Sequence, residues 1–117
     1  MILPSIHPQR REEAAIQLQI ETFDSPSRTV VLDHLPALIG RKRDVDVWVN
    51  DRFVSHLHGI LRSDGGDLVI QDLDSRNGIR VNGRLADAVS LTRGDSIELG
   101  MSRIVVEAIA FGRQSGS

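Results

Sequence analysis

The sequence predicts an all-β domain, either a sandwich or a barrel, from three observations. Short apolar stretches recur at roughly eight- to twelve-residue spacing, and turn-forming residues separate them. Several of these stretches alternate apolar and polar residues, which is the period of a strand with one buried face. The only helical candidate, residues 9–15, is too short to be stable without tertiary contacts.

The first half of the chain contains four expected strands. Ile16, Leu18 and Ile20 alternate with polar residues and predict the first strand. A cluster of turn residues at 24–28 separates it from the next apolar stretch. The four expected strands cover residues 16–21, 29–32, 37–40 and 46–49, and a loop over 50–56 follows them.

The second half predicts further strands joined by tight turns. Asp64-Gly65-Gly66 is typical of a hairpin turn, and so is Asn82-Gly83, because these residues tolerate positive φ. Asn77-Gly78 is a second Asn-Gly pair only five positions before Asn82-Gly83, so the two can hardly both be hairpin turns. The expected strands cover residues 58–63, 67–73, 79–81, 89–91, 96–99 and 102–110.

Composition limits the classes of function. The 117 residues are 40% apolar and 26% charged, which fits one soluble globular domain. The absence of cysteine excludes a disulfide scaffold and a thiolate metal site, and it fits a reducing, cytoplasmic compartment. A net charge of -2 and 3% aromatic residues argue against nucleic-acid binding and predict an aliphatic core. No apolar run is long enough to span a membrane, so no membrane association is expected.

The ends of the chain and the histidines give weaker signals. Residues 1–15 are expected to be a flexible lead-in, residues 16–110 the domain, and residues 111–117 a flexible tail. His56 and His58 could share one face of a strand and begin a metal site, but no third ligand has suitable spacing. We therefore favour one packed and one exposed histidine, with no metal, no cofactor and no catalytic residues.

Three predicted loops carry groups suited to an oxyanion. Gly40-Arg41 ends a strand, and arginine offers a planar fork of donors that matches phosphate. Ser55-His56 places a hydroxyl beside an imidazole in the next loop. Ser75–Gly78 adds a hydroxyl, a guanidinium and an amide in a third loop. Five of the basic residues fall in these loops, which favours a local basic patch on a nearly neutral body: Arg41, Lys42, Arg43, Arg52 and Arg76.

Taken together and in this order, the motifs resemble the forkhead-associated (FHA) domain family. That family has a GR pair, then SxxH, then SxNG followed closely by VNG. The sequence has Gly40-Arg41, Ser55–His58, Ser75–Gly78 and Val81–Gly83 at matching places. The similarity runs from about residue 16 to residue 110, which is nearly the whole chain.

The resemblance implies an eleven-stranded twisted β-sandwich that binds phosphothreonine peptides through loops at one end. By position, Arg41 and Ser55 contact the phosphate, and His56 is a further phosphate contact. Arg76 flanks the phosphothreonine, and Asn77 holds the peptide backbone on its C-terminal side. The residues that are mainly structural in the family are Gly40, His58, Gly78, Asn82 and Gly83.

The sequence departs from the family pattern at His56, where arginine is common, and at Ile79, where threonine is common. Arg41, Ser55 and Asn77 are retained, which favours a non-catalytic phosphothreonine-reading adaptor acting downstream of a Ser/Thr kinase. The alternative is a scaffold of the same fold that joins partners without reading phosphate. In either case the expected partner is a protein or peptide.

Overall fold

Eleven strands and no helix make up the part of the chain that the computed structural model describes, residues 11–112. No segment there can therefore cross a membrane as a helix. The strands are β1 (Glu12–Thr22), β2 (Ser25–Leu35), β3 (Ala37–Gly40), β4 (Val47–Trp48), β5 (Gly59–Asp64), β6 (Asp67–Asp72), β7 (Ile79–Val81), β8 (Arg84–Ala86), β9 (Ala88–Leu91), β10 (Ser96–Leu99) and β11 (Ser102–Phe111).

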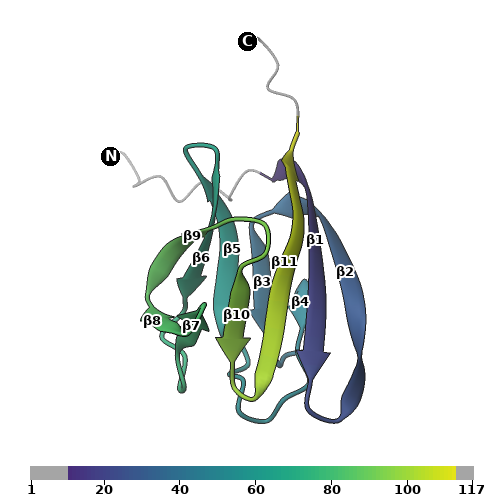
Figure 1. Cartoon of the computed structure of the whole chain (residues 1–117), viewed down its shortest axis with the longest axis vertical. Coiled ribbons are helices and arrows are strands. Elements are labelled where there is room, and N and C mark those ends of the chain that lie inside the picture. Colours follow the sequence, from purple (N-terminus) through teal and green to yellow (C-terminus); the bar gives the residue numbers. More distant parts are fainter. Residues whose placement is uncertain (1–10, 113–117) are drawn as a thin grey trace, which may run out of the picture.

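The strands form two sheets that pack into a β-sandwich (Figure 1). One sheet has the order β2-β1-β11-β10-β7-β8, and the other has the order β4-β3-β5-β6-β9. All pairs are antiparallel except β3 with β4. The eleven-stranded sandwich implied by the resemblance is confirmed.

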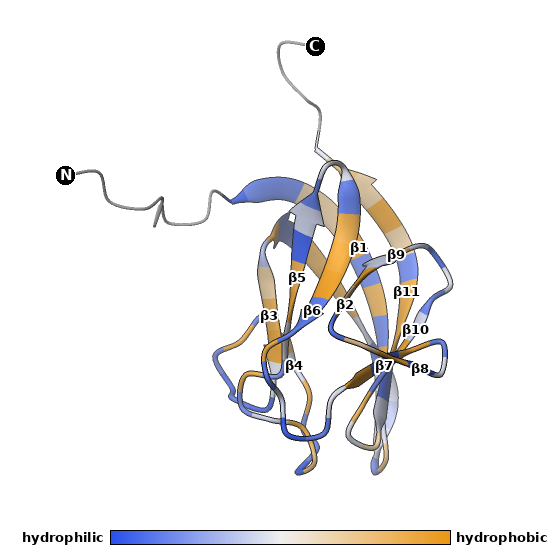
Figure 2. Cartoon of the chain, turned by 90° about the vertical axis from the view of Figure 1, so that its left-hand side faces the viewer, coloured by the Kyte–Doolittle hydropathy of each residue, from blue (hydrophilic) through white to orange (hydrophobic). Residues whose placement is uncertain are grey.

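The core between the sheets is aliphatic, as the composition predicts. Ile16, Leu18 and Ile20 of β1 are buried, and the alternation of apolar and polar residues along the strands can be followed in Figure 2. Burying one such side chain is worth about 1.5–3 kcal/mol relative to leaving it exposed. The opposite sheet adds residues of the same kind: Ala37, Ile39, Val47, Leu61, Leu68, Ile70 and Leu91.

Strand β2 is longer than the pattern predicts. The turn after β1 contains only Phe23 and Asp24, so Ser25 already pairs with Thr22, and the expected turn over 24–28 is wrong. Residues 25–29 are all exposed and include no aliphatic core residue, so they show no alternation of buried and exposed positions, and β2 is an edge strand. An edge position also accepts Pro26, which lacks an amide hydrogen.

The ends of the domain and one strand also differ from expectation. Strand β1 begins at Glu12, so residues 12–15 of the expected lead-in belong to the sandwich, where Ala14 pairs with Phe111. Phe111, the first residue of the expected tail, is likewise the last residue of β11. Residues 1–10 and 113–117 lie outside the described part. Strand β8 has no counterpart in the pattern, because it has three residues and its central Leu85 is 67% exposed.

The two hairpin turns are confirmed. Gly65 and Gly66, with φ of 59° and 91°, connect the paired residues Asp64 and Asp67. Asn82 and Gly83, with φ of 51° and 85°, connect β7 to β8. The Asn82 side chain also bonds Asp95 and the amide of Ser96, both at 2.9 Å, so this turn is held against the start of β10.

Candidate functional site

The loops after β3, β4 and β6 meet at one end of the sandwich, the lower end in Figure 1. The amide of Arg41 donates to the carbonyl of Ser55 at 3.0 Å, which joins the first loop to the second. The amide of Leu73 donates to the carbonyl of His58 at 3.0 Å, which joins the second loop to the third. The three predicted oxyanion loops therefore form one surface.

Gly40 allows the first two loops to approach closely. A Cβ atom at this position would lie 2.0 Å from the carbonyl oxygen of His56 and 3.1 Å from that of Ser55. No side chain larger than hydrogen fits there unless the second loop moves. A glycine is therefore required at this position by the close approach of the two backbone segments. This close approach also determines how far Arg41 lies from Ser55.

Arg41 is fixed at its backbone and at one guanidinium nitrogen. Its carbonyl accepts a hydrogen bond from Trp48 Nε1 at 3.1 Å, and its Nε donates to the carbonyl of Val54 at 3.0 Å. Within residues 11–112 its guanidinium makes no ion pair with a carboxylate. The two terminal amino groups of the fork are therefore available for a planar, bidentate contact with an oxyanion.

The hydroxyl of Ser55 can donate a hydrogen bond to a ligand. Its Oγ accepts the backbone amide of Arg76 at 3.0 Å. A hydroxyl has one hydrogen to donate and two lone pairs. With a lone pair occupied by Arg76, the hydrogen remains for a ligand oxygen.

His58 ties the second loop to the third. The ring is 0% exposed, its Nδ1 accepts the amide of Ser55 at 3.0 Å, and its Nε2 lies 2.8 Å from the carbonyl of Gly78. Because Nδ1 accepts, the hydrogen sits on Nε2, which donates to Gly78. Neither nitrogen is left for a metal ion, and His56 is exposed, so the expectation of one packed and one exposed histidine is confirmed.

Asn77-Gly78 is not a hairpin turn, unlike Asn82-Gly83. Asn77 Nδ2 donates to the carbonyl of Phe53 at 2.8 Å, which links the third loop to the second. Gly78 has a φ of 78°, and its amide donates to Ser75 Oγ at 2.9 Å. The pair closes the loop that carries Arg76 and places Asn77 at the surface.

These loops surround a hollow of about 660 Å³. All five residues predicted to contact a phosphopeptide line it. The lining includes three arginines and a histidine, and it includes no carboxylate. Gly40, His58 and Gly78 are not in the lining, and Asn82 and Gly83 lie in the β7–β8 turn. The lining residues are Arg41, Arg52, Phe53, Val54, Ser55, His56, Arg76 and Asn77.

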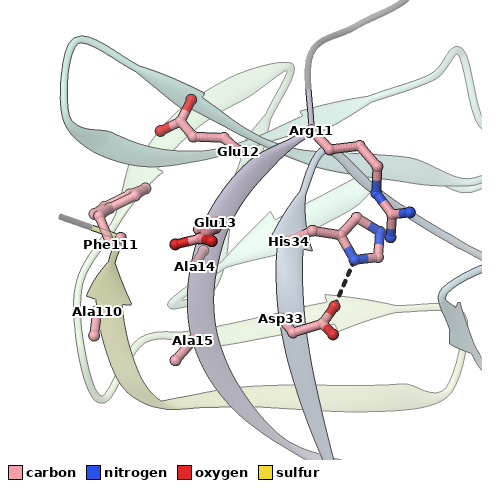
Figure 3. Close-up of a pocket in the computed structure, with 10 residues that line it drawn as sticks. Arg11, Glu12, Glu13, Ala14, Ala15, Asp33, His34, Ala110 and Phe111 are labelled. Atoms are coloured by element: carbon pink, nitrogen blue, oxygen red, sulfur yellow. Dashed lines mark hydrogen bonds and ion pairs between the residues drawn. The ribbon is translucent and has the colours of Figure 1, made fainter. Parts of the chain in front are cut away.

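A second hollow, of about 630 Å³, lies at the other end of the sandwich beside the first residues of β1 (Figure 3). Two of its charged groups are paired with each other, because His34 Nδ1 lies 2.7 Å from Asp33 Oδ1, and Glu12 and Glu13 also line it. That hydrogen bond holds the pKa of Asp33 below its ordinary value. None of the predicted site residues is present, so the basic hollow is the candidate site.

Asp51 supports the site and was not singled out from the sequence. Its Oδ1 accepts the amide of Phe53 at 2.8 Å, and its Oδ2 accepts the amide of Met101 and the hydroxyl of Ser102, both at 2.7 Å. An aspartate bonding the amide two residues on is a common local turn, which is the only sequence signal for it. Burial raises the pKa of the carboxyl, but these hydrogen bonds outweigh burial and leave that pKa below its ordinary value.

Replacing Asp51 with asparagine is expected to lower the free energy of unfolding at pH 7 by about 1–3 kcal/mol, because an amide cannot accept all three hydrogen bonds. A carboxyl whose pKa is lowered in the folded state stabilises that state fully when the pH is above the ordinary pKa of aspartate, about 3.9. That stabilisation is lost as pH falls through the folded-state value.

Urea denaturation of the wild type and Asp51→Asn across this range measures the effect. The difference between the two should shrink as pH falls from about 5 towards 2. Glu98→Gln, which changes an exposed carboxylate on β10, is the control and should show a small difference. An Asp51→Asn difference that stays constant with pH would contradict the assignment.

Comparisons with known proteins give one consistent result. The family profile described as "FHA domain" matches residues 37–100. The chain is 35% identical over 75 residues to the glycogen accumulation regulator GarA of Mycolicibacterium smegmatis, covering 64% of this chain and 48% of GarA. It is 36% identical over 93 residues to the FHA domain-containing protein FhaA of Mycobacterium tuberculosis, covering 80% of this chain and 18% of FhaA. The chain therefore spans about half of GarA and less of FhaA.

Solved structures agree with the sequence relatives. One is the FhaA FHA domain complexed with the intracellular domain of Rv3910, with 34% identity and a TM-score of 0.68 over 77% of this chain and 99% of that one. Another comes from work on phosphothreonine-dependent FHA domain interactions, with 34% identity and a TM-score of 0.69 over 79% of this chain and 96% of that one.

Proposed function

This chain belongs to the FHA domain family, and from that membership we propose that it binds phosphothreonine peptides as a non-catalytic signalling adaptor. A Ser/Thr kinase acting upstream would create the ligand. One solved relative is described by phosphothreonine-dependent interactions, and another is bound to the intracellular domain of a second protein. We propose that this chain, too, binds a protein partner through a phosphothreonine.

The observation that carries the proposal is the basic hollow with Arg41 and Ser55 at its wall. A phosphothreonine brings close to two negative charges and three strong acceptor oxygens at pH 7. Arg41 can give paired charge-assisted bonds from its terminal amino groups, while Ser55 gives a neutral one. Because the loops are bonded to one another before ligand arrives, little ordering entropy opposes binding.

The remaining residues have narrower proposed roles. His56, exposed at the rim, adds positive charge when protonated. The Arg76 guanidinium flanks the phosphothreonine, while its amide is already bonded to Ser55. Asn77 donates one Nδ2 hydrogen to the carbonyl of Phe53, and its side-chain oxygen Oδ1 can accept a peptide amide.

Matched peptides test the proposal directly. A peptide with a phosphothreonine and the same peptide with an unmodified threonine are titrated against the chain by calorimetry. We expect only the phosphorylated peptide to bind. Equal affinity for both would support the alternative, a scaffold of the FHA fold that joins partners without reading phosphate.

A further inference from the structure

The hollow holds more positive charge than one phosphate requires. Arg41, Arg52 and Arg76 all line it, and none of them makes an ion pair with a carboxylate in residues 11–112. A phosphothreonine carries about −1.5 to −2 charges at pH 7. Arg41 with one neighbour can neutralise that charge, so a third guanidinium is left at the same site.

Arg52 is the third guanidinium, and a contact with the Phe53 ring positions it. Its Cζ lies 5.1 Å from the centre of the Phe53 ring, within the range of a cation–π contact. The backbone of Phe53 is fixed on both sides, because its amide donates to Asp51 and its carbonyl accepts from Asn77. Although Arg52 is exposed, its guanidinium contacts the ring of a residue whose backbone is fixed.

We propose that Arg52 binds a second anionic group of the same phosphopeptide, so that the partner segment is acidic beside its phosphothreonine. The group is a side-chain carboxylate or a second phosphate, which offer the same chemistry to a guanidinium. The inference rests on the proposed function of the hollow and adds the chemical class of the segment that fills it.

A neighbouring hollow offers an alternative to the anionic group, which is an apolar side chain of the partner. Phe23 and Met101, which are 82% and 60% exposed, line a space of about 520 Å³ together with Asp24, Asn50, Asp51, Arg52 and Phe53. An apolar side chain of the partner could enter there. Such an occupant would cover Arg52 without giving its charge a partner, and burying an unpaired cation is costly. An anionic occupant is therefore favoured at Arg52 within the basic hollow, whose lining has no carboxylate, and not in the neighbouring space, which Asp24 and Asp51 line.

A peptide series separates these cases. The parent is a phosphothreonine peptide with uncharged flanking residues, and in its derivatives aspartate, phosphoserine or leucine replaces each flanking residue in turn. Dissociation constants are measured by fluorescence anisotropy for the wild type, Arg52→Gln and Arg93→Gln. Arg93→Gln removes the same charge from the exposed β9–β10 turn, which is not part of the hollow, and serves as the matched control.

We expect aspartate at one position to tighten binding by about three- to fivefold, and phosphoserine there by about tenfold. The gain should largely disappear in Arg52→Gln and persist in Arg93→Gln. If the parent peptide binds but no anionic derivative binds more tightly, the inference is wrong and the proposed function stands. A gain from leucine alone, or an aspartate gain that survives Arg52→Gln, also overturns it. If the parent peptide does not bind, the proposed function fails first.

Discussion

Arg41→Ala is expected to abolish measurable binding of phosphothreonine peptides. Within the described residues, Arg41 supplies the only guanidinium in the hollow whose backbone and Nε are both held by hydrogen bonds, to Trp48 of β4 and to Val54. Removing one partner of a charge-assisted contact at an interface costs about 2–5 kcal/mol. That loss is enough to bring a phosphopeptide of ordinary affinity below the detection range of calorimetry.

The matched control is Arg43→Ala, in the same loop. Arg43 has its Cζ 4.7 Å from the centre of the Trp48 ring and does not line the hollow. Each variant loses one positive charge, and the two positions are two residues apart. A general electrostatic effect would therefore weaken peptide binding equally in both. A dissociation constant for Arg41→Ala that matches the wild type, in a variant with an intact circular dichroism spectrum, would refute the assignment.

His58→Ala is expected to lower the free energy of unfolding by about 3–5 kcal/mol. The substitution leaves the amide of Ser55 and the carbonyl of Gly78 without their partner, and each unsatisfied buried group costs about 1–3 kcal/mol. It also leaves a cavity where the fully buried ring lies. Because the ring joins two binding loops, phosphopeptide affinity should fall as well.

His56→Ala provides the comparison for stability. This histidine is two residues away in the same loop and is exposed, so removing its ring should change the free energy of unfolding by less than about 0.5 kcal/mol. Denaturant unfolding of the two variants measures the contrast. Similar losses for both would show that the hydrogen bonds of His58 contribute little to the folded state.

The fold was largely predictable because its signals are local. Strands such as β1 bury every second residue, and the turns at Gly65-Gly66 and Asn82-Gly83 need residues that tolerate positive φ. Strand β8 and the ends of β2 were not predictable from the pattern. Their residues are mostly exposed, and their pairing with β7 and β1 depends on the rest of the sheet.

The site was predictable in its residue types and not in its internal bonds. Arginine beside glycine at a strand end suggests an oxyanion contact, yet nothing in the sequence says that Gly40 faces the carbonyl of His56. Asp51 reaches the β10–β11 turn fifty positions along the chain, and a contact of that separation has no local pattern. The bond from Asn77 to Phe53 is of the same non-local kind.

The pairing of β1 with β11 has a consequence for larger proteins. The amide of Gly112 donates to the carbonyl of Glu13 at 2.8 Å, so the described chain enters and leaves the sandwich side by side. That end lies opposite the three loops in Figure 1. A neighbouring domain joined at either point would extend away from the loops and leave them accessible. The domain is therefore suited to insertion as a module, and GarA and FhaA, both longer than this chain's match to them, are relatives in which such additional sequence is present.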